Sequence, residues 1–329
     1  MPSGVEVIMV AGVFAAMLTP QEAEGAIHRQ GFARLAHWLL DHGCHGVVPF
    51  GTTGEFASFA TEERIAALDR LIEDGVPANR ILVGTGAAAV ADAARLSRHA
   101  TERGCLGVLV VPPFYFKEVG EDGLFAAYAR IVEASGEAVR LYLYHFPAMS
   151  AVPVRPGLIE RLLAAWPRQI AGMKDSSGDF ENTKAIVARF PQLSVFTGDD
   201  DLLLPLLRAG GAGSITAGAN IAARLLAEIH EGWQEGGPAI EAHQRALQGL
   251  WSGLLLKYPV TEALKEILAA ETGDAGWLPM RPPLSRLSEA ARRDLLRGFR
   301  ALPLTLAQSQ RFILGETVTG SPNPSRGYP

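Results

Sequence analysis

The chain has few of the features that mark secreted, membrane-spanning or nucleic-acid-binding proteins. Only two of its 329 residues are cysteines, Cys44 and Cys105, so we expect no structural disulfide and a reducing compartment. No apolar run is long enough to span a bilayer, and the first ten residues lack the regions of a signal peptide. Lysine and arginine are scattered and the net charge is −5, so no basic patch for nucleic acid or anionic lipid is present in the sequence. These absences predict a cytoplasmic protein whose partners are small molecules.

What the sequence does contain is a regular alternation of short apolar runs and longer segments of helical period. A hydrophobic content of 48% and a charged content of 20% are typical of a globular chain with a sizeable core. Eight β/α units over about 250 residues favour a closed (β/α)₈ barrel over an open doubly wound sheet. The predicted strands are residues 12–18, 46–50, 81–84, 107–111, 140–144, 170–174, 194–197 and 213–216. The predicted helices between them are residues 24–40, 61–73, 89–103, 123–134, 156–166, 180–189 and 200–208.

The strand pattern stops at about residue 220. Helical segments follow at residues 222–234, 238–256, 260–270 and 287–300. We therefore predict a barrel domain over residues 1–220 and a C-terminal helical domain over residues 221–315. Residues 316–329 are rich in proline, glycine and serine, which predicts a disordered tail.

Lys174 is the first candidate for chemistry. In a (β/α)₈ barrel the active site lies at the carboxyl ends of the strands, and Lys174 ends the sixth predicted strand. Burial disfavours the ammonium form of a lysine, and the free amine can attack a ketone to form a Schiff base. Taken alone, the run favours a plainer interpretation, in which Lys174 extends to solvent or pairs with Asp175.

Other strand ends carry the groups that a Schiff-base reaction requires. Thr52 and Thr53 lie between two glycines after the second strand, where hydroxyls and backbone N–H groups can hold a carboxylate. Tyr115 and Tyr144 follow the fourth and fifth strands, and a phenol can transfer protons. Each has a structural alternative, as a tight turn or a half-buried aromatic. Together with Lys174 they fit a reaction in which a 2-oxo acid condenses with the amine while its carboxylate is anchored.

In order and spacing, these segments resemble the dihydrodipicolinate synthase and N-acetylneuraminate lyase family of class I aldolases. The resemblance implies a (β/α)₈ barrel with a C-terminal helical domain, a pyruvate Schiff base on Lys174, and a homotetramer or homodimer. It implies no cofactor, and we expect no metal. The segments that carry it are Gly51-Thr-Thr-Gly-Glu55, Gly84-Thr-Gly86, Pro113-Phe-Tyr115, Tyr144-x-x-Pro147, Lys174-Asp-x-x-Gly178 and Gly198-Asp-Asp200.

The same resemblance implies a role for each site residue. Tyr144 would be the proton-transferring phenol, Thr52 the relay hydroxyl, and Tyr115 the tyrosine that completes the neighbouring subunit's site. The predicted contacts of pyruvate are Thr53, which would bind its carboxylate, and Gly198 and Ile215, which would line its pocket.

Two positions concern the second substrate. Synthases of dihydrodipicolinate have an arginine five residues after the catalytic tyrosine, but this chain has Met149, which cannot bind a carboxylate. An apolar residue there resembles the sialate lyase and 2-keto-3-deoxy sugar acid aldolase branches. His145, where the family often has asparagine, either contacts the variable part of the substrate or satisfies a backbone carbonyl.

The sequence thus predicts a class I lyase or aldolase that acts on pyruvate and an aldehyde, of the kind released from 2-keto-3-deoxy sugar acids. Dihydrodipicolinate synthase and a dehydratase of the same family are the alternative enzymes. A catalytically inactive barrel that binds a 2-oxo acid is the alternative from another class. The retained Lys174, Tyr144, Thr52 and Tyr115 disfavour it, because a binding protein needs no proton relay.

Three other patterns favour a structural interpretation. Residues 41–45 have metal-ligand side chains, but they precede the second strand and so lie at the opposite end of the barrel from the site. Residues 84–89 begin like a dinucleotide fingerprint but lack its third glycine. Asp199, Asp200 and Asp201 could bind Mg²⁺, yet acidic residues are common at helix N-termini, where Asp179 and Asp200 are expected to serve as caps.

Overall fold

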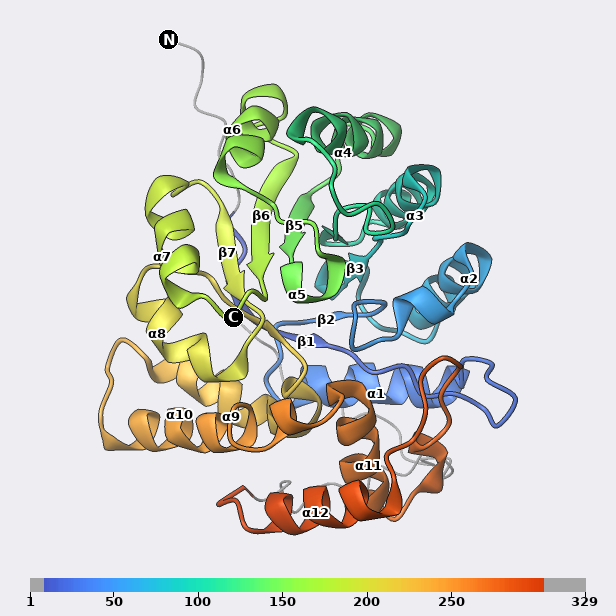
Figure 1. The fold of residues 1–329 in the computed structure, drawn as a ribbon, viewed down its shortest axis with the longest axis vertical. Coiled ribbons are helices and arrows are strands. Elements are labelled where there is room, and N and C mark those ends of the chain that lie inside the picture. Colours follow the sequence, from blue (N-terminus) through green and yellow to red (C-terminus); the bar gives the residue numbers. More distant parts are fainter. Residues whose placement is uncertain (1–8, 305–329) are drawn as a thin grey trace.

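Eight short parallel strands form the centre of the computed structural model, which describes residues 9–304 (Figure 1). Their order around the sheet is β2-β1-β8-β7-β6-β5-β4-β3, and a parallel bridge between Val47 and Ile81 joins the two outer strands. The (β/α)₈ barrel is therefore confirmed. The strands are β1 (Gly12–Ala16), β2 (Gly46–Val48), β3 (Leu82–Gly84), β4 (Gly107–Val110), β5 (Leu141–His145), β6 (Ile170–Asp175), β7 (Ser194–Thr197) and β8 (Gly213–Thr216).

The helices alternate with the strands and surround them (Figure 1). They are α1 (Arg29–Asp41), α2 (Thr61–Glu73), α3 (Val90–Glu102), α4 (Glu121–Ser135), α6 (Pro156–Ala165), α7 (Phe180–Arg189), α8 (Leu203–Arg208) and α9 (Ala219–Gly232), with a short α5 (Pro147–Ser150) after β5. The predicted helix over residues 24–40 is wrong at its start. Residues 21–27 form a turn, with Gly25 at φ +89° and a bridge between Gln21 and Ile27, so α1 begins only at Arg29.

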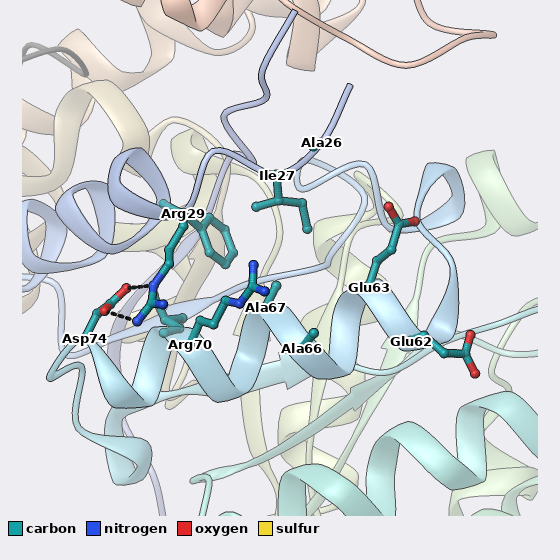
Figure 2. A pocket seen from close by; sticks show the side chains of 11 residues that line it. Ala26, Ile27, Arg29, Glu62, Glu63, Ala66, Ala67, Arg70 and Asp74 are labelled. Carbon is teal, nitrogen blue, oxygen red and sulfur yellow. Dashed lines mark hydrogen bonds and ion pairs between the residues drawn. The ribbon is translucent and has the colours of Figure 1, made fainter. Parts of the chain in front are cut away.

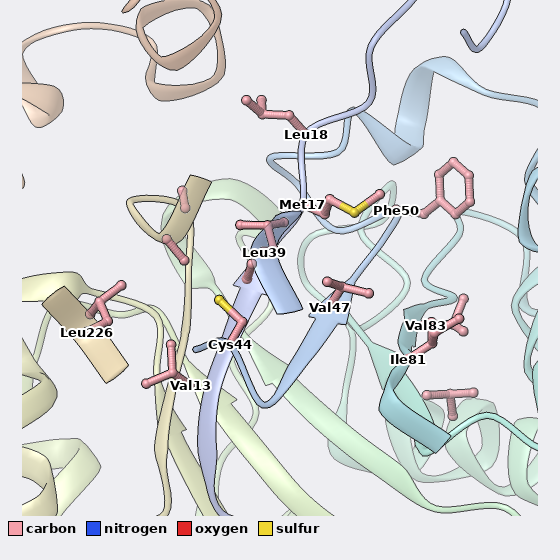
Figure 3. Close-up of a cluster of buried hydrophobic side chains, with 14 of the residues drawn as sticks. Val13, Met17, Leu18, Leu39, Cys44, Val47, Phe50, Ile81, Val83 and Leu226 are labelled. Atoms are coloured by element: carbon pink, nitrogen blue, oxygen red, sulfur yellow. The ribbon is translucent and has the colours of Figure 1, made fainter. Parts of the chain in front are cut away.

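Alternation along the strands divides the core into two clusters. Leu141 and Leu143 of β5 point outward to the helices, whereas Tyr142 and Tyr144 point into the barrel. Figure 3 shows part of the outer cluster, in which Val13 and Val47 lie near Leu39 of α1. Burial of each such side chain contributes about 1.5–3 kcal/mol to stability, so the outer cluster holds the strands in place.

A β-bulge in β6 decides which of its residues face the interior. Leu141 pairs with Ile170, but the next residue of β5 pairs with Gly172, so Ala171 is an extra residue on β6. Ala171 belongs to the inner cluster and Met173 to the outer one. Strict alternation from Ala171 would turn Lys174 outward, and the bulge is what turns it inward.

Further helices follow the barrel after α9, which packs against β1 and α1. They are α10 (Pro238–Leu250), α11 (Val260–Thr272) and α12 (Glu289–Arg300). Both α10 and α11 contact α9, and α12 packs against α11 on the outer side in Figure 1. The predicted boundary at residue 220 falls inside α9, and the division into two domains stays a prediction. The predicted tail, residues 316–329, lies outside the described residues. None of the helices in residues 9–304 has the length and apolar character needed to cross a bilayer.

Candidate active site

Lys174 and Tyr144 lie side by side at the carboxyl ends of neighbouring strands. They are direct partners in the register of β5 and β6, and both point into the barrel. The Lys174 Nζ lies 4.5 Å from the centroid of the Tyr144 ring. Only 5% of Lys174 and 4% of Tyr144 is exposed. The amine and the phenol therefore share one buried space.

Thr52 comes to this pair from the loop after β2. Its Oγ1 lies 3.4 Å from the Tyr144 Oη, so the two hydroxyls can exchange a proton along a hydrogen bond. Thr53 is buried in the same loop, whereas Thr52 is half-buried. The structure thus places Lys174, Tyr144 and Thr52 in one row, although they are far apart in sequence.

Gly198 lies directly against Lys174 at the end of β7. A Cβ at this position would lie 3.1 Å from the Lys174 Cε and would overlap the Ser176 hydroxyl. Sequence reasoning missed Ser176, although it stands two residues after Lys174 and so shares its side of the strand. On this side, the Lys174 side chain is therefore flanked by the Ser176 hydroxyl and by the backbone of Gly198.

The floor of the site is apolar. Ile215 is fully buried in the inner cluster with Phe196 and Tyr142. The rings of Phe14 and Phe196 lie 5.5 Å apart, and those of Tyr142 and Phe196 lie 6.1 Å apart. This packing places aromatic rings beneath the amine and limits its contact with water from below.

Asp175 does not pair with Lys174. Its carboxylate accepts hydrogen bonds from the Ser177 backbone N–H, the Asn182 amide and the Thr183 hydroxyl, so it is occupied on the α7 side of the strand. Lys174 forms no ion pair with any residue in 9–304. Asp199 is the nearby acidic group, where burial raises its pKa while the Trp251 indole N–H, 3.0 Å away, and the charge of Lys174 lower it. The plainer interpretation of Lys174, as a partner of Asp175 or a solvent-exposed side chain, is wrong.

His145 points away from this space. It follows Tyr144 and so faces the helices, where its Nδ1 accepts a hydrogen bond from the Val154 N–H at 3.0 Å. Burial lowers its pKa and favours the neutral ring that can accept this bond. Of the two predicted roles of His145, the bond to the backbone is closer to the observed one than the contact with substrate. The partner is a backbone N–H, however, and not the carbonyl that was predicted.

Met149 and Tyr115 are the exposed members of the predicted site. Met149, on α5, is 62% exposed, and Tyr115, after β4, is 74% exposed. The Tyr115 ring packs edge-on against Phe116, which is itself 73% exposed. Within this chain, Tyr115 is therefore not part of the buried row of Lys174, Tyr144 and Thr52.

The aspartates that the sequence suggested as helix caps have separate hydrogen-bond partners. The three aspartates diverge, since Asp199 accepts from Trp251, Asp200 from the Gly218 N–H and Asp201 from Ser252. Asp179 caps α7 as predicted, by accepting from the Asn182 N–H. The prediction of Asp200 as a cap is wrong, because it is fully buried and bonds to the loop after β8, and burial raises its pKa to about 7. No cluster of three possible metal ligands occurs in the described part of the chain.

A cavity of 330 Å³ lies away from this site, between α1 and α2 (Figure 2). Phe32, Ala67 and Leu71 form its apolar wall, and Arg29 and Asp74 pair at its rim. It contains none of the predicted site residues. The buried row of Lys174, Tyr144 and Thr52 lies instead at the carboxyl ends of the strands, and we place the site there.

Comparison with known proteins places the chain in a group of related enzymes. Residues 9–301 match the model of the Dihydrodipicolinate synthetase family. A protein from Chloroflexus aurantiacus named "Uncharacterized DapA-like lyase" is 37% identical over 71% of this chain and 78% of its own length. A 4-hydroxy-tetrahydrodipicolinate synthase from Gluconacetobacter diazotrophicus is 32% identical over 89% of this chain and 98% of its own length.

Solved structures have the same fold. Dihydrodipicolinate synthase from Agrobacterium tumefaciens superimposes with a TM-score of 0.80 and 32% identity, over 89% of this chain and 99% of that one. YagE from E. coli, a prophage protein of the dihydrodipicolinic acid synthase family crystallised with pyruvate, gives a TM-score of 0.79 and 26% identity, over 88% of this chain and 97% of that one.

Proposed function

This chain belongs to the Dihydrodipicolinate synthetase family, and we propose that it forms or cleaves a carbon–carbon bond between pyruvate and an aldehyde through a Schiff base on Lys174. Membership makes it a lyase of the class I aldolase type. The identity of the substrates, the role of each residue and the assembly are the parts that we propose.

The observation that carries the proposal is the row of Lys174, Tyr144 and Thr52. The Lys174 amine attacks the ketone carbon of pyruvate, and the carbinolamine loses its hydroxyl as water to give the imine. Loss of a proton from the methyl carbon gives an enamine, which adds to the aldehyde carbon, and water then hydrolyses the product imine. Tyr144 and Thr52, joined at 3.4 Å, move the protons of these steps.

The remaining pocket residues hold pyruvate in this mechanism. Thr53 and the N–H groups of its loop bind the carboxylate, Gly198 leaves room beside the amine, and Ile215 closes the floor. The related YagE protein was crystallised with pyruvate, which supports the same ligand here.

For the aldehyde, we propose a partner without a carboxylate at the end that meets Met149. This side chain is exposed on α5, directly after β5, and offers no charge or hydrogen-bond donor. A product of the 2-keto-3-deoxy sugar acid type fits an apolar contact there. The names of several relatives favour a second candidate, 4-hydroxy-tetrahydrodipicolinate synthase.

Tyr115 supports the proposal that the chain works as a dimer or a tetramer. An aromatic side chain that is 74% exposed next to another exposed aromatic is typical of a surface that a second protein covers. In the assembly we propose, Tyr115 enters the site of a neighbouring copy and joins its proton relay.

Borohydride trapping tests the proposed function. Incubation of the protein with pyruvate and borohydride, followed by peptide mass mapping, is expected to place one reduced pyruvate adduct on Lys174. The Lys174→Met variant serves as the control and is expected to acquire none. An adduct on a different lysine of the unmodified protein, or the absence of any adduct, would contradict the proposal.

A further inference from the structure

The loop that carries Thr52 and Thr53 begins and ends in an unusual backbone conformation. We refer to residues 50–55 as the threonine loop. Its first and last residues, Phe50 and Glu55, both have φ +58°, although neither is glycine. L-residues rarely adopt this left-handed region, and they stay in it only where the surrounding structure holds them. Each end of the loop therefore needs an anchor.

Phe50 is anchored by apolar packing. Its side chain is 1% exposed, and its ring lies 5.6 Å from that of Phe32 and 6.2 Å from that of Phe59. This end of the loop is fixed by α1 and by the segment that precedes α2.

Glu55 is anchored by a charge from outside the barrel. Its carboxylate pairs with the Lys265 ammonium on α11, and both side chains are fully buried. The second carboxylate oxygen accepts a hydrogen bond from the Gln21 amide at 2.8 Å. Lys265 also donates to the Pro279 carbonyl at 2.9 Å, and the charge of Glu262 acts on it as well. This end of the loop is thus tied to α11 and to the segment after it.

Arg281 makes a second tie in the same direction. Its guanidinium donates to the Ser58 carbonyl at 2.9 Å, to the Gly25 carbonyl at 2.7 Å and to the Glu63 carboxylate. Ser58 follows the threonine loop, and Glu63 lies in the first turn of α2. The segment after α11 therefore holds the chain on the far side of the loop as well.

Hydrogen bonds connect Glu55 to the catalytic row. The Glu55 N–H donates to the Thr52 carbonyl at 3.0 Å, and the Thr52 hydroxyl lies 3.4 Å from the Tyr144 phenol. A buried ion pair adds little to stability compared with apolar packing, but it fixes one geometry. The pair is thus better suited to placing the threonine loop than to stabilising the fold.

We propose that Glu55, held by Lys265, is a positioning residue that sets the threonine loop for binding pyruvate. The inference rests on the proposed function, because it assigns the loop to the pyruvate carboxylate. It makes the helices after the barrel a part of the active site's support, although none of their residues needs to touch the substrate.

The test compares two changes on the same helix. The double variant Glu55→Gln/Lys265→Met removes both charges, so that neither is left buried alone. The control is Glu266→Gln, the residue next to Lys265. Glu266 is also a fully buried carboxylate, but it pairs with Arg286 and Arg292 and makes no bond to the threonine loop.

Two measurements are made on each protein. The first is the pyruvate concentration at which half of Lys174 is trapped by borohydride. We expect the double variant to raise this pyruvate concentration about tenfold to a hundredfold, because a misplacement of roughly 1 Å has an effect of this size. The control is expected to leave the concentration unchanged. The second is amide hydrogen exchange of residues 50–58, expected to be faster in the double variant alone, because the Glu55 and Phe56 N–H groups bond within this segment.

The outcomes separate this inference from the proposed function. If the unmodified protein gives no adduct on Lys174, the proposed function fails, and hydrogen exchange alone decides whether the pair holds the loop. If trapping occurs but the double variant matches the unmodified protein in both measurements, the positioning role is refuted. Equal effects of the double variant and Glu266→Gln would refute it too, since they would reflect a general loss of structure.

Discussion

Met149 is the residue at which specificity can be tested most directly. It lies exposed on α5, close in sequence to Tyr144, and can offer a carboxylate no hydrogen bond. We predict that Met149→Arg raises kcat/KM for aspartate semialdehyde by about 10- to 150-fold, because a hydrogen bond to a charged group contributes about 1.5–3 kcal/mol. Steady-state kinetics with pyruvate and this aldehyde measure the change.

Met149→Leu is the matched control, since it keeps the apolar surface and is expected to leave kcat/KM unchanged. Efficient condensation of pyruvate with aspartate semialdehyde by the unmodified protein would contradict our assignment. It would favour 4-hydroxy-tetrahydrodipicolinate synthase instead.

Single residues could be predicted where their position in the barrel fixes their surroundings. Lys174, Tyr144 and Thr52 follow strands that any (β/α)₈ barrel brings together at one end, so their proximity was predictable. The direction of His145 follows from alternation with Tyr144, but its bond to Val154 depends on a loop that has no sequence signal. Asp200 resembled a helix cap, and only the packing of the loop after β8 turns it inward.

At the scale of elements, the bulge in β6 is the feature on which the chemistry depends. The run Ile170-Ala-Gly-Met173 is apolar throughout, so the sequence gives no sign that Ala171 is an extra residue. Both the strand and its end were predictable from hydrophobicity. The direction of Lys174 was not, because one added residue reverses the face to which every later side chain points.

Gly172 tests the bulge. A Cβ at this position would overlap the Ser194 carbonyl and lie 2.5 Å from the Tyr142 ring. We predict that Gly172→Ala destabilises the protein by about 1–3 kcal/mol, the usual effect of overpacking, and reduces borohydride trapping at Lys174. Thermal unfolding and peptide mass mapping give the two results.

Gly123→Ala is the matched control for this substitution. A Cβ there has open space, and the position lies in α4, where alanine is favoured by roughly 0.5–1 kcal/mol. The control is expected to unfold at the same temperature as the unmodified protein or a higher one. A Gly172→Ala protein with unchanged unfolding and trapping would show that the bulge tolerates a side chain.

At the scale of the whole molecule, the proposed role of Tyr115 makes each active site depend on a neighbouring copy of the chain. If it acts in a neighbour's site, two inactive variants can complement each other. We predict that Tyr115→Phe and Lys174→Met, each impaired alone, recover activity when co-expressed with different tags and purified as hybrids. In a hybrid pair, the subunit that keeps Lys174 receives Tyr115 from its partner, so one of the two sites is complete.

Pyruvate turnover by the purified hybrids measures this recovery. The same two variants mixed as stable, unexchanged assemblies serve as the control and are expected to stay inactive. Hybrids without recovered turnover would place the action of Tyr115 within its own chain, or outside the reaction.

Long-range contacts were the part of the fold that the sequence could not predict. Glu262, Lys265 and Glu266 have the spacing of a solvated helix face, yet all three are buried. The partners of Lys265 and Glu266 come from the threonine loop, from the segment after α11 and from α12, at separations of up to 210 residues. Helical periodicity shows that α11 forms, but not which surface it covers.

The Glu55–Lys265 pair also sets an order of events during synthesis. A ribosome makes Glu55 long before Lys265. The two residues are 210 positions apart, and six of the eight strands, β3 to β8, lie between them. A growing chain can assemble much of its barrel while the ammonium that neutralises Glu55 does not yet exist. During that interval the loop's carboxylate has to remain in water. We therefore expect the nascent barrel to stay open at the place where it will later bind its substrate, and to close there only after α11 has been made.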